Sequence, residues 1–129
     1  MIGKINYGTK VPRSGKWAES PDFTKDFYPP WPQGACGHVV SRPIANYVAG
    51  NKDRLISYQG EDSSLAIWLD ESPLKDNIVW ETTKRFTNQG NCQDTRFWII
   101  GHNISPTRMR ECFAHTDEID DIVNTPEWP

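Results

Sequence analysis

The sequence contains no run of basic residues and no long hydrophobic segment. Its 14 Lys and Arg residues are outnumbered by 17 Asp and Glu residues, and the formal net charge is −3. Because neutralising a phosphate backbone requires clustered Lys and Arg, this balance argues against a general nucleic-acid binder. No window reaches the roughly 20 apolar residues of a membrane span. The sequence therefore predicts neither a nucleic acid nor a membrane as a partner.

Cysteine is also scarce. The three cysteines lie far apart at positions 36, 92 and 112, an odd number that does not suggest a disulfide framework. The first ten residues, MIGKINYGTK, lack the apolar core of a secretory signal. We therefore expect reduced thiols and a cytoplasmic location.

A phosphate-binding loop is absent as well. The segment GTKVPRSGKW, residues 8–17, invites that comparison, but Arg13 stands where the second glycine is needed and Trp17 where a hydroxyl must hold magnesium. Pro12 with Ser14 and Gly15 indicates a turn instead. We expect a positive φ at Gly15 and a Trp17 side chain that enters the core.

Aromatic residues, proline and glycine are plentiful, with six Trp, four Tyr, five Phe, ten Pro and nine Gly. A chain of 129 residues has the usual length of one domain, so we expect a single domain over 1–129. Bulky aromatic side chains compensate for the modest apolar share of 36%. The proline and glycine content predicts short elements joined by many turns.

The hydrophobic pattern predicts an α+β fold. A short helix is expected over 43–49, because Ile44, Tyr47 and Val48 share one helical face between Pro43 and Gly50. The apolar run from 65 to 69 indicates a central strand. Strands are predicted over 54–59, 64–70, 77–86 and 95–101, and helices from Ser105 and from Thr116. This order favours a mainly antiparallel sheet with a short internal helix and C-terminal helices.

Two short Cys/His pairs are candidate metal ligands. Together they could supply the four ligands of a tetrahedral zinc ion, namely Cys36, His38, Cys112 and His115. The spacing of Cys36 and His38 is poor for chelation, and Cys112 also lies on the apolar face of its predicted helix. We therefore expect no cofactor, and a zinc-dependent hydrolase remains an alternative.

No other pattern indicates an enzyme. The chain has no nucleophile elbow and no cysteine-protease signature. Asp70 and Glu71 are adjacent, and in a strand their side chains would point to opposite faces. We therefore expect a binding protein without catalytic residues.

The most prominent charged feature is an acidic face on the helix predicted after Thr116. It consists of Asp117, Glu118, Asp120 and Asp121. The helix dipole favours acids near an N-terminus, which accounts for Asp117 and Glu118 on a solvated face. The alternative is a docking surface for a basic protein partner. Tyr28 and Trp31 are a second candidate contact patch, although they would also serve as core residues.

The stretch YGTKVPRSGKW, with Pro12, Ser14, Gly15 and Trp17, resembles the small β-barrel module of bacterial polymorphic-toxin immunity proteins, including those beside type VI secretion effectors. The resemblance covers residues 7–32, up to the segment YPPWPQG. It implies a cytoplasmic protein that neutralises a cognate toxin by stoichiometric occlusion. A phage-encoded anti-defence inhibitor of a host enzyme is the alternative of the same class.

Overall fold

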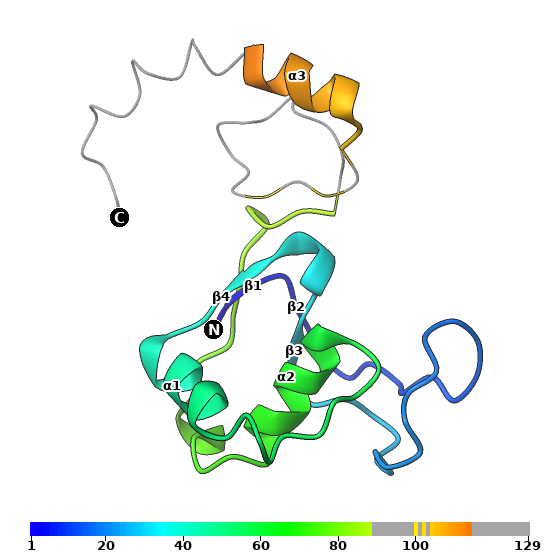
Figure 1. The fold of residues 1–129 in the computed structure, drawn as a ribbon, viewed down its shortest axis with the longest axis vertical. Coiled ribbons are helices and arrows are strands. Elements are labelled where there is room, and N and C mark those ends of the chain that lie inside the picture. The colour runs from blue at the N-terminus through cyan, green and yellow to red at the C-terminus, as the bar shows by residue number, and fades with distance from the viewer. Residues whose placement is uncertain (89–99, 101, 103, 115–129) are drawn as a thin grey trace. The chain divides into compact units, whose positions relative to one another are not determined.

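The computed structural model describes residues 1–88, 100, 102 and 104–114 (Figure 1). The chain divides into two compact units, Met1–Thr83 and Lys84–Pro129. The single domain expected over 1–129 stays a prediction.

The first unit contains two small β-sheets. In the larger sheet, β1 (Ile2–Gly3) is the central strand, antiparallel to β4 (His38–Val39) and parallel to β5 (Glu81–Thr82). In the smaller sheet, β2 (Ile5–Asn6) pairs with β3 (Trp31–Pro32) in antiparallel fashion. The larger sheet is therefore mixed.

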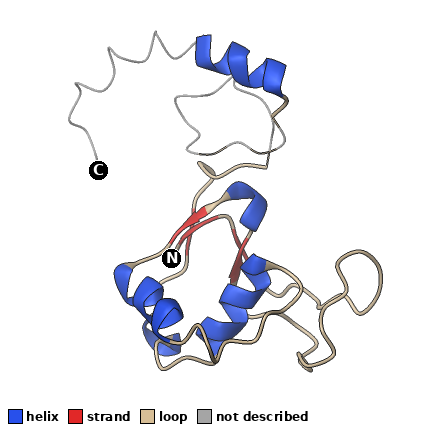
Figure 2. Cartoon of the chain, in the orientation of Figure 1, coloured by secondary structure: helices blue, strands red, loops and turns tan. Residues whose placement is uncertain are grey.

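Two α-helices and two 3₁₀ turns complete this unit (Figure 2). The helices are α1 (Arg42–Gly50) and α2 (Glu61–Asp70), and the 3₁₀ turns are Gly34–Cys36 and Lys75–Asn77. Figure 1 shows α1 and α2 below β1 and β4. A small mixed sheet together with helices confirms the predicted α+β class.

Helix α1 forms where the sequence predicts it. Pro43 lies in its first turn, where a missing N–H costs no hydrogen bond, and Ile44 faces the core. Beyond Gly50, the Asn51 N–H donates to the carbonyls of Tyr47 and Val48 and ends the helix.

The strand predicted over 64–70 is wrong, because this segment is helix α2. Its apolar run continues without alternation because the helix is deeply buried, with Ala66, Ile67 and Leu69 at 0%, 1% and 0% exposure. A short continuous apolar run suits a buried helix as well as a central strand. Glu61 and Asp62 in the first turn favour the helical choice through the helix dipole.

The other strand predictions are corrected in part. Residues 54–59 form no strand, and 77–86 is reduced to β5 and an isolated bridge at Phe86. Phe86 pairs with Ile100 in parallel, whereas the sequence favoured a mainly antiparallel sheet. Of the strand predicted over 95–101, residues 95–99 and 101 lie outside the described residues.

Two apolar clusters form the core of the first unit. One consists of Met1, Ile5, Ile44 and Leu69, and the other of Val11, Phe23, Tyr28 and Ile67. Helix α2 contributes to both, and it packs against β3. Because α2 contributes to both clusters, its position is fixed on two sides.

The turn at residues 8–17 is partly as expected. Gly15 has φ +83°, which confirms the predicted left-handed conformation. Trp17, however, is 60% exposed, so the expected core position is wrong. The Lys16 ammonium lies 4.7 Å from the centre of the Trp17 ring, which is the range of a cation–π contact.

In the second unit, α3 (Pro106–Ala114) begins where the sequence predicts it. The Ser105 hydroxyl accepts a hydrogen bond from the Arg108 N–H at 3.2 Å, as an N-cap does. The helix predicted from Thr116 lies outside the described residues. Within the part of the chain that is described, no helix is long and apolar enough to span a membrane.

Candidate functional site

The first turn of α2 lies against the loop that precedes β4. The Gly34 N–H donates to Asp62 Oδ2 at 2.8 Å, across 28 positions of sequence. A Cβ atom at Gly34 would overlap the Glu61 carboxylate, so glycine allows this carboxylate to lie directly on the loop. The loop is itself anchored, because the Gln33 N–H donates to the Lys4 carbonyl at 2.9 Å. Two carboxylates therefore occupy defined places beside the loop.

His38 follows this loop on β4. Gly37, with φ +66°, makes the sharp turn that leads into the strand. The His38 side chain is half-buried, and its Nδ1 atom is buried without a hydrogen-bond partner. Burial lowers the pKa of His38, and the negative charges of Asp62 and Glu61 only partly oppose this effect. The imidazole is therefore neutral near pH 7, a state in which one ring nitrogen can accept a proton.

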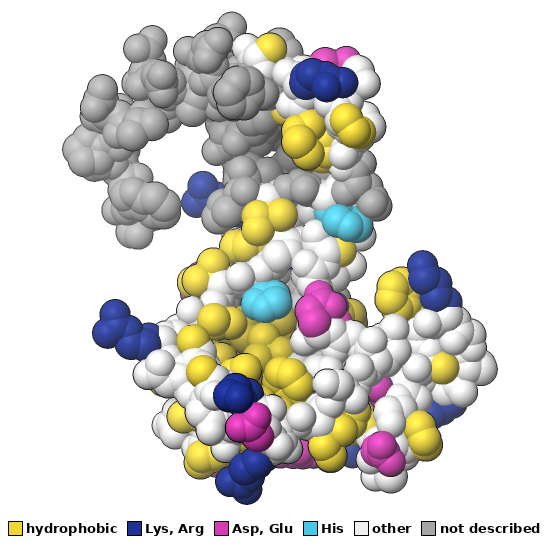
Figure 3. Space-filling view, in the orientation of Figure 1, with side chains coloured by type: hydrophobic (Ala, Val, Ile, Leu, Met, Phe, Trp, Pro, Cys, Tyr) yellow, Lys and Arg dark blue, Asp and Glu magenta, His cyan; other side chains and the backbone are white. Residues whose placement is uncertain are grey.

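The Asp62 carboxylate is held by two backbone donors. Its Oδ1 accepts from the Ser63 N–H at 2.8 Å, and its Oδ2 accepts from Gly34. A carboxylate can accept about four hydrogen bonds, so a further donor can still bind here. Asp62 is half-buried, and Glu61 is exposed. Figure 3 shows a histidine and an acidic side chain beside hydrophobic side chains on one face of the first unit.

The buried carboxylate of Glu19 accepts a hydrogen bond from the first turn of α2. Glu19 is 6% exposed and accepts from the Tyr28 hydroxyl at 2.7 Å and from the Ser63 hydroxyl at 3.3 Å. The N–H groups of Ser20 and Gln59 also donate to it, each at 2.8 Å. Burial raises the pKa of Glu19, but these hydrogen bonds outweigh burial, and the pKa is lowered overall. With four donors, this carboxylate has a structural role.

Tyr28 and Trp31, the predicted aromatic contact patch, are part of this interior. Tyr28 is 9% exposed, and its ring stacks on Phe23 with centroids 5.6 Å apart. Burial and the nearby Glu19 raise the pKa of the Tyr28 phenol. Trp31 is half-buried, and its Nε1 donates to the Thr9 hydroxyl at 3.0 Å. The predicted acidic face, Asp117, Glu118, Asp120 and Asp121, lies outside the described residues.

The zinc candidates are placed as follows. Cys36 is fully buried, burial raises the pKa of its thiol, and the thiol donates to Gln33 Oε1 at 3.4 Å. Cys112 is disulfide-bonded, so the expectation of reduced thiols is wrong for this residue. His115 lies outside the described residues. Among residues 1–88 and the described parts of 100–114, no cluster of three or more His, Cys, Asp or Glu side chains could hold a metal.

The adjacent acids Asp70 and Glu71, which the sequence did not favour as a catalytic pair, stand at the end of α2. Asp70 is bound by two lysines, with Lys25 Nζ at 2.7 Å from Oδ2 and Lys75 Nζ at 2.7 Å from Oδ1. Burial raises the pKa of Asp70, but the two lysines outweigh this effect and lower the pKa overall. Asp70 is the last residue of α2 and Glu71 is its C-cap, so the two side chains do not lie on opposite faces of a strand.

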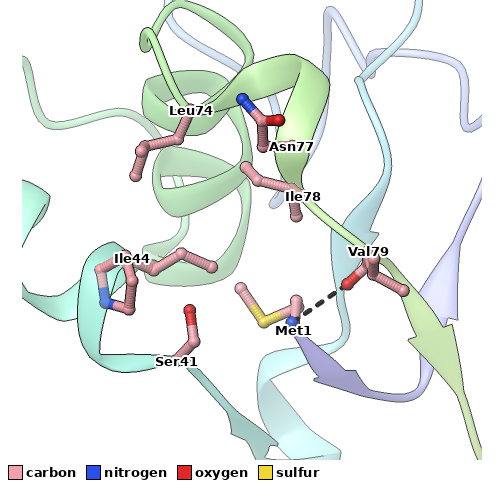
Figure 4. A pocket seen from close by; sticks show the side chains of 8 residues that line it. Met1, Ser41, Ile44, Leu74, Asn77, Ile78 and Val79 are labelled. Atoms are coloured by element: carbon pink, nitrogen blue, oxygen red, sulfur yellow. Dashed lines mark hydrogen bonds between the residues drawn. The ribbon is translucent and has the colours of Figure 1, made fainter.

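Two cavities lie elsewhere in the first unit. One is an apolar pocket of about 330 Å³ between Ile44, Leu74 and Ile78, where the Met1 amino group donates to the Val79 carbonyl at 3.1 Å (Figure 4). Its polar side chains are Ser41 and Asn77. The other cavity, of about 230 Å³, lies at the C-terminal end of α2 beside Asp70 and Trp80.

Comparison with known proteins gives a different class from the one suggested by the sequence. No family model matches the chain. Over 67 residues, 52% of this chain, it is 40% identical to UDP-GalNAc:beta-1,3-N-acetylgalactosaminyltransferase 2 of Mus musculus and 39% identical to the protein of the same name in Homo sapiens. Over 112 residues, 84% of this chain, it is 30% identical to hydroxyproline O-galactosyltransferase GALT5 of Arabidopsis thaliana. These relatives are glycosyltransferases.

The chain spans only 13% of the mouse and human proteins and 16% of the plant protein. The likeness nevertheless overturns the resemblance to toxin immunity proteins. That resemblance rested on residues 7–32, where Pro12, Ser14 and Gly15 specify a turn, and many unrelated proteins share such a turn. The similarity to glycosyltransferases extends over 67 to 112 residues.

The same relatives correct the predictions of function, partner, activity and location. A toxin partner, stoichiometric occlusion, a phage inhibitor and the absence of catalysis are all wrong for a chain with these relatives. The expected cytoplasmic location is wrong as well. The disulfide at Cys112 agrees with this correction, because disulfides persist mainly in oxidising compartments.

Sequence reasoning did not single out Glu61 and Asp62. The available signal was a glycine followed by two acids and two serines before an apolar run, which is a helix N-terminus pattern. The strand prediction over 64–70 concealed this signal. No pattern in the sequence indicates that Gly34 lies against the acid pair.

Proposed function

We propose that this chain forms part of a glycosyltransferase and contributes the Asp62 carboxylate as the base for an acceptor hydroxyl. The observation that carries the proposal is the hydrogen bond from the Gly34 N–H to Asp62, which holds a half-buried carboxylate next to a neutral histidine. The relatives support the reaction class. One is named as using UDP-GalNAc, and the other as forming an O-galactosyl bond on hydroxyproline.

The chemistry of such a transfer requires a base. The bond between the sugar C1 and the diphosphate oxygen breaks, and the nucleoside diphosphate leaves with the electron pair. A new bond forms between C1 and the acceptor oxygen, whose proton must pass to a nearby group. A carboxylate within hydrogen-bond reach of the hydroxyl is suited to accept it.

Three side chains at the site differ in their suitability as this base. Asp62 is fixed by two backbone N–H donors, and a base held in one position loses less entropy on reaching the reactive geometry. Glu61 is more exposed. Its carboxylate can add negative charge to the site or accept a hydrogen bond from a bound hydroxyl. His38 is neutral, so it can accept a hydrogen bond without adding a positive charge.

The same proposal includes the compartment. A disulfide at Cys112 and relatives that glycosylate other molecules both favour an oxidising, secretory environment for this chain.

The decisive experiment is a chimera. The first unit, Met1–Thr83, contains Asp62 and replaces the corresponding part of the mouse relative, of which the chain spans 13%, and transfer from UDP-GalNAc is measured. The chimera is expected to transfer sugar, and Asp62→Asn is expected to lower kcat by about 10²-fold or more, as loss of a general base does. Asp22→Asn is the matched control, because Asp22 is exposed on the first unit and is not part of the site.

Two results would contradict the proposal. A chimera that folds, shown by an unchanged melting temperature, but transfers no sugar removes the assignment of the chain to this reaction. An active chimera in which Asp62→Asn behaves like Asp22→Asn removes Asp62 as the base. The pH profile distinguishes the two kinds of base, since carboxyl groups ordinarily lose their proton at a lower pH than imidazoles do.

A further inference from the structure

The cavity of about 230 Å³ at the C-terminal end of α2 has one apolar side and one polar side. Leu69, Ile78 and the half-buried Trp80 line it with apolar surface, and Pro29 and Pro30 add to this surface. Lys75 and Asp76 line its polar side together with Asp70. An occupant must therefore present both an apolar face and hydrogen-bonding groups.

The charges around this cavity balance. Asp70 lies between Lys25 and Lys75, each with a 2.7 Å ion pair to a different carboxylate oxygen. Asp76 supplies a second negative charge, so two lysines face two aspartates. A phosphate or a carboxylate would find no net positive charge here, which favours a neutral occupant.

The polar groups can bind hydroxyls. An ammonium group has three N–H donors, and the Lys75 ammonium donates to Asp70, so it can also donate to an occupant. The Asp76 carboxylate can accept from a hydroxyl. A pyranose ring meets both demands, since its C–H face can lie on an aromatic ring while its hydroxyls bind charged side chains. A cavity below the roughly 300 Å³ at which drug-sized ligand pockets begin suits one sugar ring.

The location of the cavity restricts which sugar it can bind. Asp70 follows Asp62 by eight positions on α2, a rise of about 12 Å along the helix axis. The reacting sugar and the acceptor hydroxyl must meet at the Asp62 end. A ring at the Asp70 end therefore belongs to a more distant part of an extended acceptor.

We propose that the cavity beside Trp80 and Lys75 is a subsite for a neutral pyranose unit of the acceptor, about 12 Å from the transfer site. This proposal rests on the proposed function for its acceptor. The binding of a simple sugar at this place can be measured without any transfer.

The test uses the full chain labelled with ¹⁵N and titrated with methyl β-D-galactopyranoside and methyl β-D-N-acetylgalactosaminide. The indole N–H signal of Trp80, assigned with Trp80→Phe, is expected to shift together with the backbone signals of Lys75 and Asp76. In Lys75→Gln, affinity is expected to fall about tenfold, because a charged hydrogen-bond donor is lost. Lys52→Gln is the matched control, since Lys52 forms an exposed ion pair with Asp53.

Each result either supports or overturns the proposed subsite. Shifts at Trp80 that weaken in Lys75→Gln and persist in Lys52→Gln support it. Absence of shifts at Trp80, or equal affinity in both lysine variants, overturns it. Asp62→Asn is expected to leave this binding intact, so a failure of the transfer proposal leaves the sugar titration unchanged. A failure of the subsite likewise leaves transfer by the chimera in place.

Discussion

The Gly34 amide donates a hydrogen bond to the Asp62 carboxylate at 2.8 Å, and these residues are 28 positions apart in the sequence. This contact joins the loop before β4 to the first turn of α2. It brings His38 into the electrostatic range of two carboxylates, whose negative charges partly oppose the lowering of the His38 pKa by burial. The arrangement depends on a residue without a side chain, because a Cβ at Gly34 would overlap the Glu61 carboxylate.

Gly34→Ala is therefore expected to displace Glu61. The overlapping atom is the end of a flexible side chain, so the loss in unfolding free energy is small, about 1 kcal/mol. Loss of sugar transfer in the chimera should exceed the loss expected from stability alone. Gly50→Ala is the control, because a Cβ there meets no atom within 4 Å, and it is expected to gain about 0.5 kcal/mol. Urea unfolding measures both. A larger loss of stability in Gly50→Ala than in Gly34→Ala would contradict this account.

Tyr28→Phe is expected to destabilise the first unit by about 1–3 kcal/mol, because it removes one donor from the buried Glu19 carboxylate. Chemical denaturation at pH 7 measures the loss. Tyr7→Phe is the comparison, since the Tyr7 hydroxyl donates to the Trp80 carbonyl at 3.3 Å in an exposed setting. Equal losses in the two variants would show that the buried hydrogen bond to Glu19 contributes no more to stability than the exposed one of Tyr7.

The pH dependence of stability follows from Glu19. Its pKa in the folded chain is below the ordinary value of 4.5, so the unfolded chain takes up the proton first as pH falls. The contribution of Glu19 to stability is present above the unfolded pKa and is lost as pH decreases through the folded pKa. Unfolding free energies of the unmodified chain and Glu19→Gln, measured between pH 7 and pH 3, should therefore converge toward low pH. Parallel curves would contradict the lowered pKa.

His38 produces a second pH effect at higher pH. Burial lowers the pKa of His38 below its ordinary value of 6.5, so protonation favours the unfolded chain. Stability is expected to decrease as pH falls from the unfolded pKa toward the lower folded pKa. His38→Phe should remove this decrease, and it should be close to neutral at pH 7 because it also removes the unpaired buried Nδ1. A persistent decrease in His38→Phe would assign the effect to another group.

Truncation of Phe23 should destabilise the chain far more than truncation of Trp17. Trp17 is 60% exposed, and Trp17→Ala is expected to change stability by about 0.5 kcal/mol or less. Phe23 is 4% exposed and stacks on Tyr28, so Phe23→Ala is expected to cost about 3–5 kcal/mol. Thermal unfolding of both variants distinguishes these values. A large loss in Trp17→Ala would restore the core position that the sequence predicted.

The sequence by itself determined the features that depend on neighbouring residues. Pro43 and Gly50 bound α1, and Ser105 with Pro106 begins α3, because capping and backbone restrictions act within a few positions. The positive φ of Gly15 was also predictable, since it follows from the local turn.

Only the tertiary structure decided between strand and helix for residues 64–70. An apolar run satisfies either form, and the choice depends on burial of Ile67 and Leu69 in two separate clusters. The exposure of Trp17 depends in the same way on what packs nearby. The contact of Gly34 with Asp62 joins segments far apart in the chain, and local propensity carries no information on which distant segments meet.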